Sequence, residues 1–131
     1  MDEDQNKFFD EIIAKIQNIQ GTDYIYFLGN DYQIIKEQKV NGSNNYLEQI
    51  LNIVKSEPRF EEIGTNLYSK PFHTYTLLNE TGLIVISKLQ AKENLYLVII
   101  AGENKSVDLI NLLKTCKESR LGYQALLNTN V

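Results

Sequence analysis

The clearest pattern in the chain is the recurrence of apolar residues every three or four positions between Gln5 and Ile19. This spacing predicts an amphipathic helix with one face turned to a core. Asp2 and Asp4 stand at its start, where carboxylates cap free backbone amides and complement the helix dipole. Gly21 follows the last apolar position and marks the end of the helix. The apolar positions are Phe8, Phe9, Ile12, Ile13, Ile16 and Ile19.

The next segments form a predicted hairpin. Tyr24–Leu28 is an unbroken apolar run, which is typical of a strand covered on both faces. Gly29–Asp31 has the composition of a turn, and Tyr32–Val40 then predicts the returning strand. Because residues 36–39 are all polar, this second strand is expected at an exposed edge of the sheet.

A second helix is predicted over about Asn45–Ser56, and Pro58 helps to end it. Residues 57–70 follow as a polar segment without a clear periodicity. Beyond it lie three runs of strand character at 72–78, 83–89 and 95–101, joined by short turns. The last run is apolar throughout, so it is expected at the centre of the sheet.

The last predicted helix covers about Val107–Glu118. Asn104 or Ser106 is expected to cap it, and the short tail from Leu121 onward has no assigned structure. Its expected buried stripe consists of Leu109, Ile110, Leu113 and Cys116.

The resulting order is helix, strand, strand, helix, strand, strand, strand, helix. It predicts an α/β fold, an α+β sandwich in which a five-stranded, mainly antiparallel sheet has helices on both faces. With 131 residues, the chain is expected to form a single domain over 1–131, with its core at about 5–120 and a tail at 121–131.

Charge and hydropathy exclude two classes of partner. The net charge is −4 and the isoelectric point is near 5.0, so neither a nucleic-acid-binding patch nor a polybasic membrane anchor is expected. The apolar runs at 24–28 and 95–101 are far shorter than the roughly 20 residues of a membrane helix. The acidic, polar start of the chain is unlike a secretory signal. We therefore expect a soluble, cytoplasmic protein.

Candidate catalytic chemistry is sparse. The single histidine, His73, lies in a predicted strand and the single cysteine, Cys116, lies in a predicted helix, where a small core residue is the simpler interpretation. No ligand spacing for zinc and no phosphate-binding glycine loop occurs. The acidic pair Glu61–Glu62 is interpreted as solvated surface. The sequence thus predicts no catalytic residue, no cofactor and no metal, and a protein that is not an enzyme.

The second helix carries more apolar surface than one sheet contact requires. Two neighbouring stripes span roughly 160° of its circumference, against the roughly 100° that a helix on a sheet typically buries. Either the helix is sunk deeply, for instance under residues 57–70, or one stripe meets a second subunit. The stripes are Tyr46, Ile50 and Ile53, and Leu47, Leu51 and Val54.

The strand at 72–78 favours the second subunit. His73, Thr74, Tyr75 and Thr76 favour strand structure, yet the run carries no lysine, inward charge or internal proline to protect an edge. If it lies at an edge, it could pair with its own copy across a two-fold axis.

The order of elements and several segments resemble the Roadblock/dynein light chain family over about Phe8–Arg120. Thr81–Leu89 and Asn94–Gly102 with the helix that follows resemble its last hairpin and closing helix. Ile16–Gly21 leading into Tyr24–Leu28 resembles its opening join from helix to strand.

This resemblance implies a homodimer, or a heterodimer with another roadblock protein, that scaffolds or regulates a small Ras-like GTPase. The implied dimer interface consists of Leu47, Ile50, Leu51, Val54, His73, Thr74, Tyr75 and Thr76. The implied GTPase contact is the polar outer face of the second helix, namely Asn45, Glu48, Gln49 and Asn52. The alternatives are a light chain of a dynein-type motor without a GTPase partner, and a small-ligand sensor of the PAS or GAF type, which would need a cavity between sheet and helix.

Overall fold

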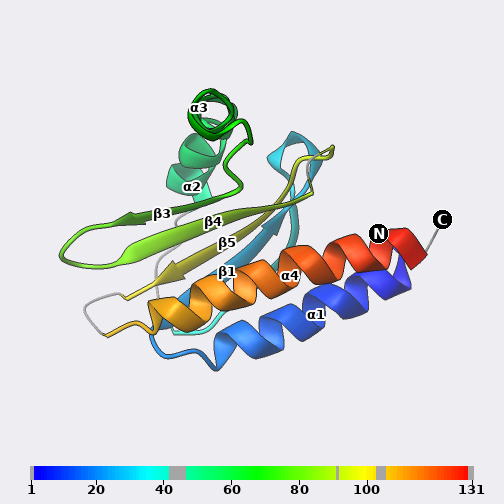
Figure 1. Cartoon of the computed structure of the whole chain (residues 1–131). Coiled ribbons are helices and arrows are strands. Elements are labelled where there is room, and N and C mark those ends of the chain that lie inside the picture. The colour runs from blue at the N-terminus through cyan, green and yellow to red at the C-terminus, as the bar shows by residue number, and fades with distance from the viewer. Residues whose placement is uncertain (1, 42–46, 91, 103–105, 130–131) are drawn as a thin grey trace.

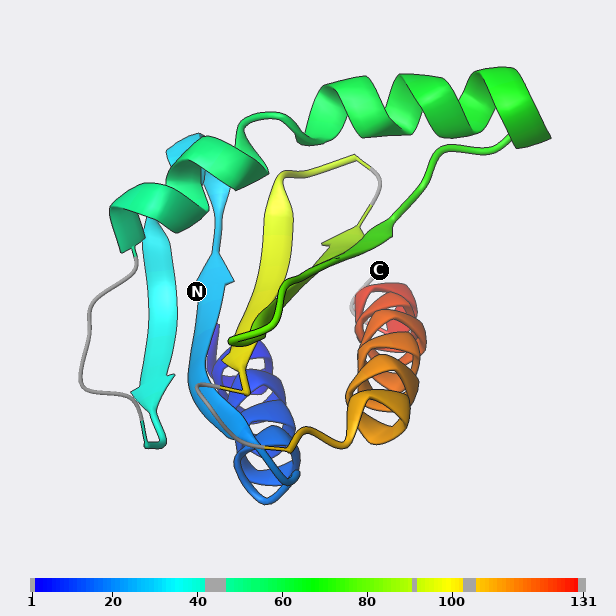
Figure 2. The ribbon, with the colours of Figure 1, turned by 90° about the vertical axis from the view of Figure 1, so that its left-hand side faces the viewer.

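The computed structural model describes residues 2–41, 47–90, 92–102 and 106–129. It contains a five-stranded antiparallel sheet with α1 and α4 on one face and α2 and α3 on the other (Figure 1 and Figure 2). The elements are α1 (Glu3–Gln17), β1 (Thr22–Leu28), the 3₁₀ turn η1 (Asn30–Tyr32), β2 (Ile34–Lys39), α2 (Leu47–Val54), α3 (Glu57–Tyr68), β3 (Thr74–Leu78), β4 (Leu83–Gln90), β5 (Leu95–Ala101) and α4 (Leu109–Thr129).

The strand order is β2-β1-β5-β4-β3, so β5 is central and β2 and β3 form the edges. All seven residues of β5 are buried, which confirms the prediction from its unbroken apolar run. The pairs Ile25 with Ile99 and Tyr26 with Val98 fix the register between β1 and β5. Because side chains alternate along a strand, each of these strands supplies apolar residues to both faces.

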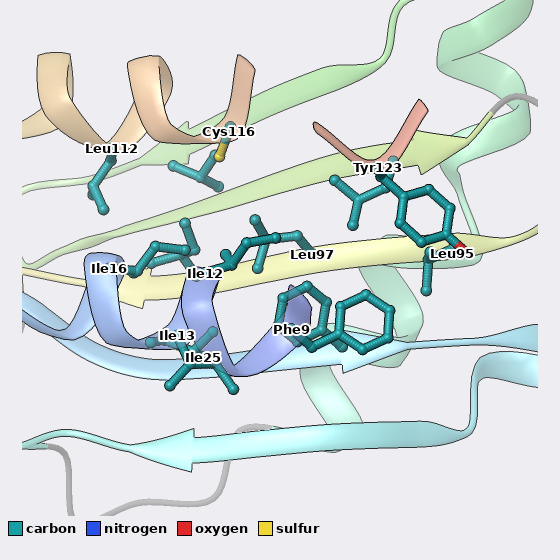
Figure 3. Close-up of a cluster of buried hydrophobic side chains, with 14 of the residues drawn as sticks. Phe9, Ile12, Ile13, Ile16, Ile25, Leu95, Leu97, Leu112, Cys116 and Tyr123 are labelled. Carbon is teal, nitrogen blue, oxygen red and sulfur yellow. The ribbon is translucent and has the colours of Figure 1, made fainter. Parts of the chain in front are cut away.

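The larger core lies between the sheet and the pair α1 and α4 (Figure 3). Phe9 of α1 packs on Phe27 of β1, with ring centroids 4.5 Å apart, and lies stacked against Tyr123 of α4. The helices and strands together bury fifteen side chains here, which gives the fold its main apolar stabilisation.

Helix α1 begins as its sequence predicts. The Asp2 side chain accepts a hydrogen bond from the Gln5 backbone amide at 2.8 Å, and the Asp2 amide donates to the Gln5 side chain at 3.3 Å. This reciprocal pair satisfies two of the free amides at the helix start. The buried residues of α1 are Phe9, Ile12, Ile13 and Ile16.

Helix α4 is longer than expected and buries a different face. The tail from Leu121 is helical as far as Thr129, and Asp108, rather than Ser106, accepts a hydrogen bond from the Asn111 amide at 3.2 Å; Asn104 lies outside the described residues. The predicted stripe was wrong at Ile110 and Leu113, which are 81% and 38% exposed, whereas Cys116 is buried and Leu109 is half-buried against the core. The buried positions are Leu112, Cys116, Ser119 and Tyr123.

The segment 57–70, which has no readable periodicity, contains α3, and α2 ends at Val54 rather than at Ser56. Pro58 opens the new helix instead of closing the old one, because it occupies the first turn, where a backbone N–H has no partner within the helix. Within the described residues, no helix is long and apolar enough to cross a membrane.

Cys116 provides a test of this packing. It is buried against the α1 and α4 core, and burial raises the pKa of its thiol to about 12. At pH 8 only about one thiol in ten thousand would then be ionised. We expect maleimide labelling of the native protein to be slower by at least about a thousandfold than labelling in urea. Rapid native labelling would contradict the buried position of Cys116.

Candidate interaction surface

The face of the sheet under α2 is only partly covered. Ile50 and Val54 of α2 pack on side chains of β1, β5 and β4. Beside this contact, above β4 and β3, lies an open hollow of about 330 Å³. Its apolar lining is Ile53, Leu77, Leu78, Leu83, Ile84, Ile100 and Ala101. The sheet therefore presents apolar surface that the described residues leave uncovered.

The apolar residues of α2 are not divided into the two stripes that the sequence predicts. One residue from each stripe, Ile50 and Val54, is fully buried because these two positions lie one helical turn apart. Leu47 and Leu51 flank them on one side and Ile53 on the other, and all three are half-buried. As Ile50 and Val54 have no exposed surface, the side chains that remain for an interface are the flanking ones; Tyr46 lies outside the described residues.

A second, narrower hollow of about 190 Å³ lies between α3 and β3. Phe60 of α3 and Tyr75 of β3 form one wall, with ring centroids 5.1 Å apart. Further along α3, Ile63 and Leu67 are 46% and 65% exposed. We call the apolar surface made by these hollows and by α3 the open face; it consists of Ile53, Phe60, Ile63, Leu67, Tyr75 and Leu77.

Strand β3 lies at the edge of the sheet beside the open face, which meets the condition set for pairing with a second copy. It pairs with β4 on one side, and in the described part of the chain no strand pairs with its other side. Leu77 and Leu78, which we did not single out from the sequence, are 45% and 69% exposed on this strand. The sequence could have indicated these two leucines, because they form a short apolar run at the end of a possible edge strand.

The predicted interface residues on this strand take different positions. His73 precedes β3 and its Nδ1 lies 2.7 Å from the Thr74 hydroxyl, which in turn lies 3.1 Å from the Ser87 hydroxyl. Tyr75 turns towards α3, whereas Thr76 shares the opposite face of the sheet with Val85.

The outer side of α2 is polar. Glu48, Gln49 and Asn52 are exposed on the side of the helix away from the sheet, as the helical spacing predicts. Asn45, the fourth residue of this predicted contact, lies outside the described residues.

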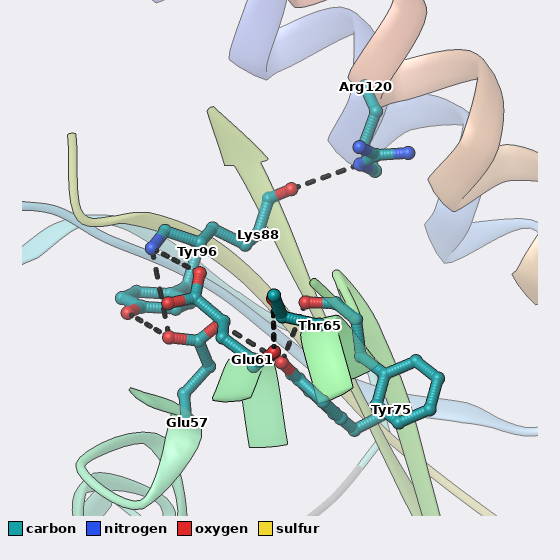
Figure 4. A network of polar contacts seen from close by, with 8 residues as sticks. Glu57, Glu61, Thr65, Tyr75, Lys88, Tyr96 and Arg120 are labelled. Carbon is teal, nitrogen blue, oxygen red and sulfur yellow. Dashed lines mark hydrogen bonds and ion pairs between the residues drawn. The ribbon is translucent and has the colours of Figure 1, made fainter. Parts of the chain in front are cut away.

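A buried polar cluster holds α3 beside the open face (Figure 4). The Glu57 carboxylate is 1% exposed and accepts hydrogen bonds from the hydroxyls of Tyr75 at 3.0 Å and Tyr96 at 3.3 Å. The Lys88 ammonium lies 2.7 Å from Glu61 and 3.7 Å from Glu57. Glu61 is thus half-buried and paired, so the prediction of solvated surface holds only for its neighbour Glu62.

Burial alters the acidity of these groups. It raises the pKa of Glu57, and the hydrogen bond with Glu61 acts in the same direction, while the Lys88 charge opposes both. Burial and the nearby Glu57 carboxylate also raise the pKa values of the Tyr75 and Tyr96 hydroxyls, which therefore remain neutral donors.

The remaining candidate chemistry lies apart from this surface. Cys116 is a core residue between α4 and the sheet, as interpreted from the sequence. Partial desolvation and the Arg120 charge lower the pKa of His73. In the part of the chain that the structure describes, no group of three or more histidine, cysteine or acidic residues is arranged to hold a metal ion.

Comparison with known proteins gives structural matches only. No protein-family model matches the chain, and neither does any curated protein. A Roadblock/LC7 domain from Streptomyces avermitilis has a TM-score of 0.66 at 11% identity and is matched over 87% of this chain and 92% of its own. MglB from Myxococcus xanthus has a TM-score of 0.62 at 10% identity, and the match covers 94% of this chain and 97% of the MglB chain.

An MglB in a tetrameric arrangement has a TM-score of 0.68 at 11% identity, over 90% of this chain and 83% of its own. All three matches cover 87% or more of this chain. At these identities they establish the architecture and not the activity. The chain therefore has the Roadblock/LC7 fold, as its order of elements predicts.

Proposed function

We propose that this protein is a non-catalytic, dimeric scaffold that binds a small Ras-like GTPase or a complex containing one. The observation that carries the proposal is the open face, which lies beside β3, an edge strand whose outer side pairs with no strand in the described residues. Apolar surface of this kind marks an interface in proteins that are otherwise polar outside.

A second copy of the chain is the partner that fits the open face best. Pairing of β3 with its own copy would satisfy the free backbone groups of both edges at once. The same two-fold axis would bring each open face against the other, so that Ile53 and Leu77 become buried. One similar structure is an MglB in a tetrameric arrangement, which supports assembly of this fold from several copies. A heterodimer with another roadblock protein would use the same surfaces.

The GTPase assignment follows from the resemblance to the Roadblock/dynein light chain family. The polar outer side of α2, with Glu48, Gln49 and Asn52, stays accessible when the open face is covered, because it points away from the sheet. It is the surface we assign to the GTPase. A contact built from such groups would confer specificity and would respond to charge reversal.

The dimer can be tested with Leu77→Asp. A carboxylate in place of this 45% exposed leucine would be desolvated in the dimer but not in the monomer. We expect the dimer dissociation constant, measured by sedimentation equilibrium, to rise by at least about thirtyfold. The matched control is Leu121→Asp, which places the same charge at an exposed leucine of α4 away from the open face. Equal dissociation constants for both variants would rule out the open face as the interface.

The GTPase contact can be tested by pull-down from an extract of the source cell. Immobilised wild-type protein is expected to retain a Ras-like GTPase, identified by mass spectrometry. Because charge reversal would repel the same partner, the double variant Glu48→Lys, Asn52→Lys is expected to lose at least about nine-tenths of it. Recovery of a dynein intermediate chain, or equal retention by both proteins, would contradict the assignment.

A further inference from the structure

Helix α3 is attached to the sheet in an unusual way. Of its twelve residues, all within the described part of the chain, the two that are buried are Glu57 and Gly64. Its apolar side chains are half-buried or exposed, whereas α1 buries four apolar side chains. Hydrophobic burial, the main source of helix docking in most domains, therefore contributes little to the position of α3.

The polar cluster supplies the attachment instead (Figure 4). Through Glu57 and Glu61, the first two turns of α3 bind side chains of three different strands: Tyr75 on β3, Lys88 on β4 and Tyr96 on β5. The other end of the helix meets the returning chain at Gly64, where an added methyl group would come within 2.5 Å of the Phe72 nitrogen.

The junction between α2 and α3 allows movement. Pro58 has no N–H, so it cannot donate to the Val54 carbonyl and continue α2 into α3. Ser56, at the start of α3, makes no side-chain capping hydrogen bond. Single-turn backbone bonds, from Ser56 to Ile53 at 3.0 Å and from Arg59 to Ser56 at 3.1 Å, are what joins the helices here.

The charges of the cluster do not balance. Two carboxylates, Glu57 and Glu61, share one ammonium, that of Lys88. The Arg120 guanidinium of α4 keeps its charge, but its Nε donates to the main-chain carbonyl of Lys88, 3.1 Å away, and in the described part of the chain the ion pairs of Glu57 and Glu61 are with Lys88. The tyrosine hydroxyls on β3 and β5 are neutral. With both carboxylates ionised, one negative charge is thus left without a partner in a buried site.

We propose that α3 is a releasable arm, held on the sheet by the Glu57–Lys88–Glu61 cluster, and that uptake of one proton by the cluster tightens it. The proposal rests on the proposed function in one respect: because α3 carries Phe60, Ile63 and Leu67 of the open face, its release disassembles half of the dimer surface.

The direction of the pH dependence follows from proton linkage. The pKa of Glu57 is raised in the docked state by burial, so the docked arm binds a proton more tightly than the released arm. Docking is therefore strongest at a pH near or below 4.5, the ordinary pKa of a glutamate. It weakens as the pH rises through the raised pKa that Glu57 has in the docked state. A protonated Glu57 can donate to Glu61 and still accept from both tyrosines, while Lys88 keeps its ion pair with Glu61.

Hydrogen exchange of the whole protein tests this arm directly. Protection factors of the amides at 60–68, corrected for the intrinsic pH dependence of exchange, are expected to fall as the pH is raised above 4.5, by up to about tenfold per pH unit. Glu57→Gln should keep the high protection at pH 7.5 and lose the pH response, because an amide cannot ionise. The control Glu62→Gln, at the exposed neighbour of the cluster, should behave as the wild type.

Lys88→Met gives the opposite change. The buried Glu57 and half-buried Glu61 carboxylates, left without their cation, should lower the protection of 60–68 at pH 7.5 by at least about tenfold, while the amides of β5 stay protected and show that the domain is folded. A wild-type protein without pH-dependent protection, or a Glu57→Gln variant that keeps the dependence, would overturn the proposal. Sedimentation in the same buffers separates the two proposals. If the protein is a monomer and the protection of α3 depends on pH, only the dimer proposal is contradicted. If it is a dimer and the protection of α3 does not depend on pH, only the arm proposal is contradicted.

Discussion

The two-sided apolar character of the central strands constrains the whole domain. The seven residues of β5 are all buried, so both faces of the sheet need cover. The chain provides two long helices for one face, and these enclose a complete core. For the other face it provides the eight-residue α2 and the twelve-residue α3. Helix α2 packs on β1, β5 and part of β4, and an open hollow remains over the rest of β4 and β3. The open face results from this difference, because the helices cover one face of the sheet completely and the other face only in part.

The features that do not belong to the larger core, namely β3, the hollows and α3, lie in this same region. The edge strand β3 and the arm α3 lie on this side of the molecule (Figure 2), and residues of both line the narrower hollow. The arm is held by the buried Glu57 carboxylate and the Lys88 ammonium. These groups fix the orientation of α3 and make its attachment depend on charge, and they add little apolar stabilisation. This surface consists of the edge strand β3 and of α3, which is bound through charged side chains. Such a surface suits reversible association better than the fully enclosed core under α1 and α4 does.

The sequence predicted the elements that follow one dominant period or an unbroken apolar run, such as α1 and Leu95–Ala101. It did not reveal α3, because the residues that α3 buries are Glu57 and Gly64 and leave no apolar periodicity. In α4 it selected the wrong face, since Ile110 is exposed whereas Ser119 is buried. Periodicity locates a helix, but the choice of the buried face depends on neighbours that are distant in the sequence. The interface on α2 and β3 therefore stays a prediction, and the structure adds that Ile50 and Val54 are buried within the chain itself.

The central claim is that a second copy pairs at β3, and the concentration dependence of hydrogen exchange in this strand tests it most directly. As the protein is diluted from a dimer, of twice the 15.1 kDa chain mass, to a monomer, the account predicts faster exchange at the amides of 74–78 and unchanged exchange in β5. Exchange in 74–78 that stays constant while the mass changes would place the interface elsewhere and contradict the account.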